Sequence, residues 1–138
     1  MSMRSLTTED HETARQWWTD HHKLPDRSLM DAFEWPARGW GFEDGQGELI
    51  AMIFAYYDPD SACGIVCYPV TSPTAGYGIR THRALIRLIS DVVDELRKLG
   101  ARRIFGSTQV PAVADSYLHN NFIRAYESHE FVYKGDLS

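Results

Sequence analysis

The fold is decided by residues 83–100, RALIRLISDVVDELRKLG, in which apolar residues recur at helical spacing. The apolar face of this long helix consists of Leu85, Leu88, Ile89, Val92, Val93, Leu96 and Leu99. Charged residues lie mostly on the other side. Gly100 stands where a left-handed residue commonly ends a helix, and Ala101 alone separates it from a strand predicted over Arg102–Ser107.

A second strand is predicted before this helix, over Ala62–Val70. The predicted order is therefore strand, loop, long helix, short turn and strand. This order makes a βαβ unit, in which two parallel strands are joined by a right-handed crossover. Further upstream, Arg38–Glu43 and Glu48–Tyr57 flank the glycine-rich sequence Asp44-Gly45-Gln46-Gly47, the pattern of a hairpin. The nearly continuous apolar run 49–57 indicates a central strand.

The remaining elements are shorter. A first strand is expected over Met3–Thr7, followed by a helix that Thr7, Thr8 or Asp10 caps and that runs to about Asp20. Further helices are expected over Ser28–Phe33 and Pro111–Asn120, and final strands over Phe122–Tyr126 and Glu130–Lys134. The order β-α-α-β-β-β-α-β-α-β-β predicts one mixed α/β domain over residues 1–138.

Composition excludes few classes but sets expectations. The net charge of −5 comes with scattered basic residues, so we expect no nucleic-acid partner. No apolar run approaches the ~20 residues of a membrane helix, and no signal peptide is evident, so a cytoplasmic protein without membrane contact is expected. Cys63 and Cys67 lie too far apart on one strand for a disulfide and lack a second pair with metal-ligand spacing.

Two stretches resemble the GCN5-related N-acetyltransferase (GNAT) family. In 70–78, VTSPTAGYG, Gly76 and Gly78 fit the glycines of the family's phosphate loop, although Pro73 replaces its usual Gln or Arg. A second register, counted back from Ala84-Leu85, puts Tyr77, Arg80 and His82 at the motif positions and is similar to phage-encoded acetyltransferases.

The second stretch is 117–122, YLHNNF, which resembles the family's Tyr-x-x-x-Gly-Phe sequence. Asn121 replaces the glycine, and asparagine tolerates the left-handed conformation that the turn requires. The resemblance covers nearly the whole chain. It implies the GNAT fold, a mixed and mostly antiparallel sheet with a central parallel βαβ unit flanked by helices, and acetyl-CoA as co-substrate.

A helix N-terminus offers unpaired N–H groups and partial positive charge to a pyrophosphate. The residues expected around the coenzyme A phosphates are Ala75, Gly76, Tyr77, Gly78, Ile79, Arg80, Thr81, His82 and Arg83. The alternative is a loop that only turns the chain into the helix. The resemblance further implies that the pantetheine follows the backbone near Cys67–Val70, including Tyr68 and Val70, where an N–H polarises the thioester carbonyl.

Tyr117 matches the family tyrosine that protonates the departing thiolate, and the alternative is a packing tyrosine. The general base stays open among Glu43, Asp58 and Asp60. Other residues fit two interpretations each. The acceptor entrance could be lined by Asp31 and Glu34. A core position suits Trp35, Trp40 and Phe42 better than an acceptor pocket does. A solvated helix suits His11, His21 and His22 better than a metal site does.

The function predicted first is an N-acetyltransferase that moves an acetyl group directly from acetyl-CoA to an amine of a small molecule or protein. The alternative is a catalytically inactive module of the same fold that binds coenzyme A or a protein partner. A third option is a structural or regulatory homodimer formed through edge strands near the C-terminus. The acyl length and the acceptor cannot be read from the sequence.

Overall fold

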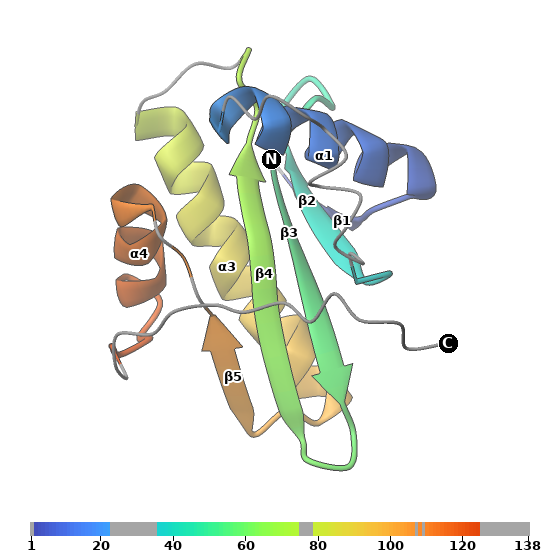
Figure 1. The fold of residues 1–138 in the computed structure, drawn as a ribbon, viewed down its shortest axis with the longest axis vertical. Helices are drawn as coiled ribbons and strands as arrows, with labels where there is room; N and C mark the ends of the chain where they lie inside the picture. Colours follow the sequence, from blue (N-terminus) through green and yellow to red (C-terminus); the bar gives the residue numbers. More distant parts are fainter. Residues whose placement is uncertain (1, 23–35, 75–78, 107, 109, 125–138) are drawn as a thin grey trace, which may run out of the picture.

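The computed structural model describes residues 2–22, 36–74, 79–106, 108 and 110–124. Its strands are β1 (Ser2–Ser5), β2 (Gly39–Glu43), β3 (Leu49–Asp58), β4 (Cys63–Thr71) and β5 (Arg103–Gly106). Its helices are α1 (Thr8–His22), α3 (Ile79–Leu99) and α4 (Pro111–Leu118). The sheet order is β1-β2-β3-β4-β5, with α3 on one face and α1 on the other (Figure 1).

The predicted βαβ unit is confirmed. β4 and β5 pair in parallel from Cys63↔Arg103 to Val66↔Gly106, and α3 makes the connection between them. All other neighbouring strands pair antiparallel. As Figure 1 shows, the first turn of α3 lies at the same end of the sheet as the end of β4. This places a helix N-terminus beside the strand that the resemblance assigns to pantetheine.

α3 ends as its sequence predicts. Gly100 has φ +114°, and its N–H donates to the carbonyl of Arg97 at 3.0 Å. The N–H of Ala101 donates to the carbonyl of Leu96 at 3.0 Å, so both bonds of a Schellman motif are present. The apolar face of α3 is fully buried against the sheet at Leu88, Ile89, Val92 and Leu96.

The opposite face of the sheet carries a smaller core under α1. Ala14 of α1 packs with Met52, Phe54 and Val70 of the central strands. The hairpin between β2 and β3 also has the predicted turn, in which the N–H of Asp44 donates to the carbonyl of Glu48 at 2.8 Å. The antiparallel half of the sheet therefore follows the sequence closely, with strand ends shifted by a residue or two.

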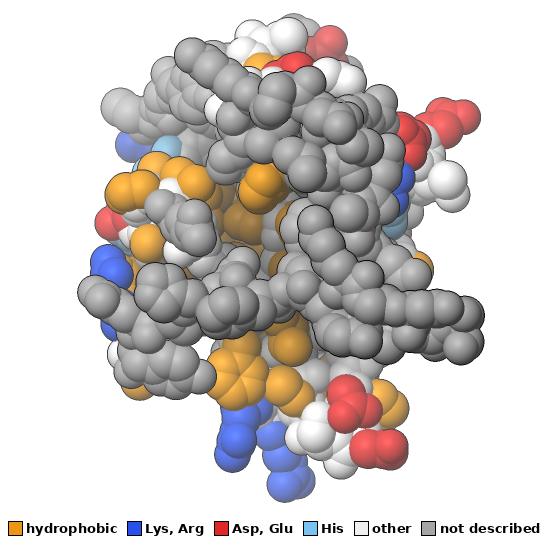
Figure 2. All heavy atoms as spheres, viewed as in Figure 1, with side chains coloured by type: hydrophobic (Ala, Val, Ile, Leu, Met, Phe, Trp, Pro, Cys, Tyr) orange, Lys and Arg blue, Asp and Glu red, His pale blue; other side chains and the backbone are white. Residues whose placement is uncertain are grey.

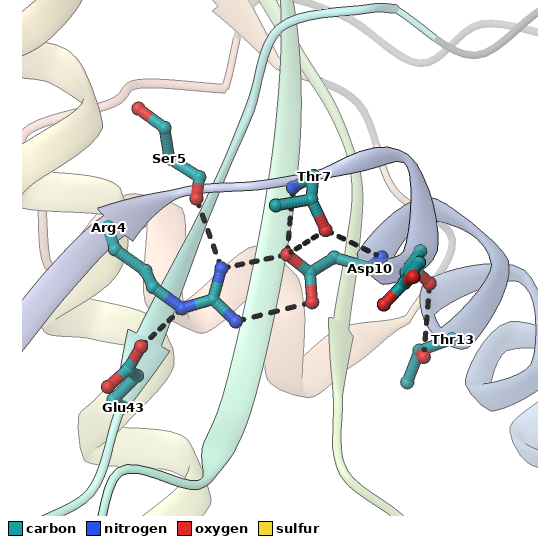
Figure 3. Close-up of polar contacts among 7 residues, drawn as sticks. Arg4, Ser5, Thr7, Asp10, Thr13 and Glu43 are labelled. Atoms are coloured by element: carbon teal, nitrogen blue, oxygen red, sulfur yellow. Dashed lines mark hydrogen bonds and ion pairs between the residues drawn. The ribbon is translucent and has the colours of Figure 1, made fainter.

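The start of α1 is fixed by a cluster of charged and hydroxyl side chains (Figure 3). Thr7 and Asp10 cap the helix reciprocally: the N–H of Thr7 donates to Asp10 at 2.8 Å, and the N–H of Asp10 donates to the Thr7 hydroxyl at 3.3 Å. Arg4 of β1 donates to both carboxylate oxygens of Asp10 and pairs with Glu43 of β2. The cluster joins β1, α1 and β2.

The C-terminal part departs from the prediction. α4 ends at Leu118, and Asn121 has φ +64°, the left-handed conformation expected of it. Residues 122–124 belong to no strand, so the strand predicted to begin at Phe122 does not begin there. The helix predicted over Ser28–Phe33 and the strand over Glu130–Lys134 lie outside the described residues. Within the described ranges, no helix is long and apolar enough to cross a membrane.

Candidate functional site

The site lies where β4 and β5 part. Among the described residues, Val66↔Gly106 is the last pair between them, whereas β4 runs on to Thr71. A bulge occurs in this upper half of β4: its register with β3 shifts between Met52 and Phe54, and Tyr68 has φ +52°. Such a bulge bends its strand and increases the local twist. One edge of the upper β4 backbone, residues 67–71, therefore lies beyond the last β5 pair.

Tyr117 of α4 covers the end of β5 at this point. A Cβ placed on Gly106 would come within 3.0 Å of the Tyr117 ring and within 3.0 Å of the Val66 side chain, so only glycine lets the ring lie here undisturbed. Tyr117 is 5% exposed, and its hydroxyl has no hydrogen-bond partner among the described residues. Such an orphaned buried hydroxyl is uncommon and costs about 1–3 kcal/mol.

The charge state of the phenol follows from its surroundings. Burial raises the pKa of Tyr117, and the neighbouring Cys67 raises it further, so the phenol is protonated at neutral pH. Cys67 itself is partly buried, and desolvation raises the pKa of its thiol to about 12. It is therefore a protonated thiol, not an activated nucleophile. Sequence reasoning did not identify Cys67 and Tyr117 as neighbours, because they lie 50 positions apart along the chain.

Two basic residues of the first α3 turns are already paired with carboxylates. Arg80 Nη2 donates to Asp44 Oδ2 of the β2–β3 turn at 3.0 Å. His82 Nε2 lies 3.0 Å from Asp115 Oδ2 of α4, and its Nδ1 lies 3.5 Å from the Ser116 hydroxyl. These carboxylates were not identified from the sequence, because neither lies near its partner along the chain.

The end of β4 is also held from α1. His21 Nε2 lies 2.6 Å from the carbonyl oxygen of Thr71, so the ring bonds the strand just before the loop to α3. The sequence suggested only a solvated helix end for His21. Tyr68 is held from the same helix, through an edge-on contact with Trp18 at 6.3 Å between ring centroids. α1 therefore positions the upper half of β4.

The predicted cofactor residues fall into three groups. Arg80, Thr81, His82 and Arg83 lie in the first turns of α3, and of these Thr81 is buried at 4% exposure. The side chains of Tyr68 and Val70 pack under α1, so only their backbone faces a ligand along β4. Ile79 begins α3. The loop residues Ala75, Gly76, Tyr77 and Gly78 lie outside the described part of the chain.

The other candidates are placed away from this site or in the core. Glu43 pairs with Arg4, whereas Asp58 and Asp60 lie at the β3–β4 turn, at the opposite end of β4. Trp40 and Phe42 are buried core residues. Asp31, Glu34 and Trp35 fall outside the described residues. In the described ranges, no three His, Cys, Asp or Glu side chains form a group that could hold a metal ion.

No protein-family model matches the chain, and no protein of curated function matches its sequence. Solved structures do match it over nearly its full length. The ribosomal-protein-alanine N-acetyltransferase of Brucella melitensis has a TM-score of 0.59 at 16% identity, covering 98% of this chain and 100% of that one. The aminoglycoside antibiotic 6′-N-acetyltransferase of Acinetobacter haemolyticus has a TM-score of 0.58 at 10% identity, covering 99% and 100%.

A third match is a Mycobacterium tuberculosis protein in complex with CoA and a second ligand. Its TM-score is 0.65 at 16% identity, with coverage of 95% of this chain and 76% of that one. At these identities the likeness establishes a shared fold, and the expected fold is thereby confirmed.

Proposed function

We propose, from the GNAT fold that this chain shares with those structures, that it is an acetyl-CoA-dependent N-acetyltransferase acting on an amine of a small molecule or protein. The observation that carries the proposal is the buried Tyr117 hydroxyl, which has no hydrogen-bond partner in the described part of the chain and lies beside the last pair between β4 and β5. A proton donor without an acceptor is costly in a packed core, and a departing thiolate would supply the acceptor. We also propose that the chain forms one domain and that the protein is cytoplasmic. Its similarity to phage-encoded acetyltransferases stays a prediction.

The proposed co-substrate fits the chemistry of the surrounding backbone. The phosphates would bind at the N-terminus of α3, where the unpaired N–H groups of the first helical turn and the helix dipole favour an anion. Pantetheine would follow the upper half of β4, whose edge lies beyond β5. Pro69 has no N–H, so the donors available to the ligand in this stretch come from the other residues of 67–71.

Direct transfer is the mechanism that these residues support. A covalent route would need an activated nucleophile. Cys67 is the thiol whose charge acts on Tyr117, but burial raises the pKa of this thiol to about 12, so it is not activated. In direct transfer the amine attacks the thioester carbonyl, the C–S bond breaks, and the sulfur takes the Tyr117 proton. The proton that the amine loses passes to a base, a carboxylate or an ordered water, and Tyr117 regains its proton from solvent. A backbone N–H of β4 would stabilise the negative charge that develops on the carbonyl oxygen.

Calorimetric titration with acetyl-CoA tests the site before any acceptor is known. Binding is expected below millimolar concentration, with competition from free coenzyme A. Absence of binding at millimolar acetyl-CoA would overturn both the enzyme and the binding-module interpretation.

Release of free thiol across an amine panel then tests the reaction. The panel should include a peptide with N-terminal alanine and an aminoglycoside, because two structural relatives are named for these acceptors. With an active acceptor, Tyr117→Phe should slow release at least about tenfold, as removal of a general acid does, and leave acetyl-CoA binding unchanged. An unchanged rate would remove the acid role from Tyr117.

One observation favours the binding module. β4 carries no carboxylate, and the three proposed bases lie either in an ion pair or at the far end of the strand. A protein that binds acetyl-CoA but releases no thiol with any amine of the panel would be that module.

A further inference from the structure

Three apolar side chains form an exposed row across the sheet, on the face opposite α3. Tyr56 of β3 is in register with Ile65 of β4, which is in register with Phe105 of β5. They are 46%, 44% and 49% exposed. Their neighbours along the strands, such as Val66 and Ile104, point to the α3 core instead. We call these three residues the apolar row.

A second row runs beside the first on the same face. Asp58 is in register with Cys63, which is in register with Arg103. Since side chains two residues apart share a face, each member lies next to a member of the apolar row. This charged row is acidic at β3 and basic at β5, with the Cys63 thiol between them. The Asp58 carboxylate also accepts hydrogen bonds from the Ser61 hydroxyl at 2.8 Å and from the Asp60 N–H at 3.2 Å, and these bonds lower its pKa, so it is charged within the turn. Figure 2 shows hydrophobic side chains at the lower end of the sheet, with Lys/Arg side chains on the β5 side and Asp/Glu side chains on the β3 side.

We propose that two copies of this chain dimerise through this face, about a two-fold axis that runs along β4. Such an axis exchanges the β3 and β5 sides of the face. Asp58 of each copy then meets Arg103 of the other, and Tyr56 meets Phe105. Cys63 and Ile65 lie on the axis and meet their own copies. The charges of the two surfaces are complementary, and the interface closes after two copies.

The charged row decides between two possible axes. A two-fold axis perpendicular to the strands would place Asp58 and Arg103 each against its own copy if it crossed the charged row. If it passed between the two rows, it would place these charges against the apolar Tyr56 and Phe105 of the other copy, which leaves them without charged partners. Like charges directly opposite each other and charges without a partner are both unfavourable, so both arrangements are rejected. The proposed axis also leaves the two β4 strands aligned, within the ~30° that the twist of packed sheets imposes.

The size of the interface predicts a weak dimer. Six side chains in two rows cover less than the ~800 Å² that each partner buries in a standard interface. We therefore expect a reversible dimer that appears at tens of micromolar protein and dissociates on dilution or in high salt, which screens the ion pairs. This face differs from the C-terminal edge strands that the sequence suggested for assembly.

Sedimentation equilibrium on paired charge variants tests the proposal. Asp58→Lys and Arg103→Glu should each remove the dimer, because each variant sets like charges against one another twice in the interface. An equimolar mixture of the two variants should dimerise again, because both cross-interface pairs are then of opposite charge. A simple folding defect in either variant would not be corrected by mixing.

Asp94→Lys and Arg97→Glu serve as matched controls. This exposed pair on α3 undergoes the same charge changes at a distance from the face, so both controls should dimerise like the parent chain. Crosslinking gives a second measure: a short bismaleimide should join two copies through Cys63, and Cys63→Ser, unlike Cys67→Ser, should abolish the product.

A chain that is monomeric at hundreds of micromolar would overturn the proposal. So would a dimer that survives both single variants, since another surface would then form it, whether an edge strand or a C-terminal segment. The face lies at the opposite end of β4 from the acetyl-CoA site. Loss of the dimer should therefore leave acetyl-CoA binding unchanged, and the outcomes for the two proposals stay separate.

Discussion

At the scale of single residues, the Tyr117 hydroxyl is a buried polar group without a partner in the described part of the fold. Its ring fills space over Gly106 and lies 5.0 Å from the Phe122 ring, but its oxygen bonds no described residue. We predict that Tyr117→Phe leaves the free energy of unfolding unchanged or raises it by up to about 1–2 kcal/mol, since a buried unsatisfied polar group is removed. Urea unfolding measures this difference.

Tyr117→Leu provides the contrast for that measurement. It removes the aromatic ring as well as the hydroxyl, and we expect it to destabilise the fold by about 2–4 kcal/mol, in the range of large-to-small core changes. A loss of stability in Tyr117→Phe would mean that the hydroxyl has a structural partner. Higher stability together with lower activity would instead be the signature of a functional residue.

Asp10 makes stability depend on pH in the acid range. Hydrogen bonds from Arg4, and then those from Thr7, hold the pKa of its carboxyl at about 2 against the opposing effect of burial. In the unfolded chain the pKa of an aspartate is about 3.9. The Asp10 carboxylate therefore stabilises the fold fully when the pH is above that pKa. The contribution is lost as the pH falls from about 4 to about 2.

We therefore predict that Asp10→Asn lowers the free energy of unfolding at pH 7 by about 1–2 kcal/mol, the usual range for a lost helix cap. At pH 2 the variant and the parent should unfold at similar urea concentrations. Asp94→Asn, which loses only an exposed helix pair, should shift unfolding by at most about 0.5 kcal/mol at any pH. A constant difference for Asp10→Asn down to pH 2 would contradict the assignment.

At the scale of elements, the end of α3 depends on one backbone conformation. Gly100 has φ +114°, and a Cβ there would lie 2.9 Å from the Tyr57 hydroxyl. We predict that Gly100→Ala destabilises the fold by about 1–2 kcal/mol, because an L side chain is strained in this region. Thermal unfolding checks the value. Gly45→Ala is the matched control, since its Cβ would meet nothing within 4 Å.

The elements themselves were predictable because their signals are local. Three signals each act over a few positions and appear as predicted: the 3.6-residue period of residues 85–99, the Gly100 cap and the glycine-rich turn at 44–47. Thr7 and Asp10, two of the three residues predicted as alternative caps, cap the helix together, and the third, Thr8, is its first residue. The strand predicted from Phe122 was wrong for residues 122–124, which belong to no strand, and the rest of that segment lies outside the described residues.

At the scale of the whole molecule, the site depends on contacts that no local signal carries. The neighbourhood of Cys67 and Tyr117 arises from the parting of two strands, a bulge at Tyr68 and the return of α4 over Gly106. The pair of Arg80 and Asp44 likewise depends on the hairpin reaching the start of α3. The sequence could name the element that forms the site, but only the packed fold shows which side chains meet there.

The parting of β4 from β5 also means that the ligand would complete the sheet. Backbone groups of residues 63–66 face described residues of β5, whereas residues 67–71 face none of the described residues of that strand. In hydrogen–deuterium exchange, saturating acetyl-CoA should slow labelling of peptides that contain 67–71 and leave those of 63–66 unchanged. Equal protection of both halves would mean general tightening, and the co-substrate would then not act as a temporary sixth strand.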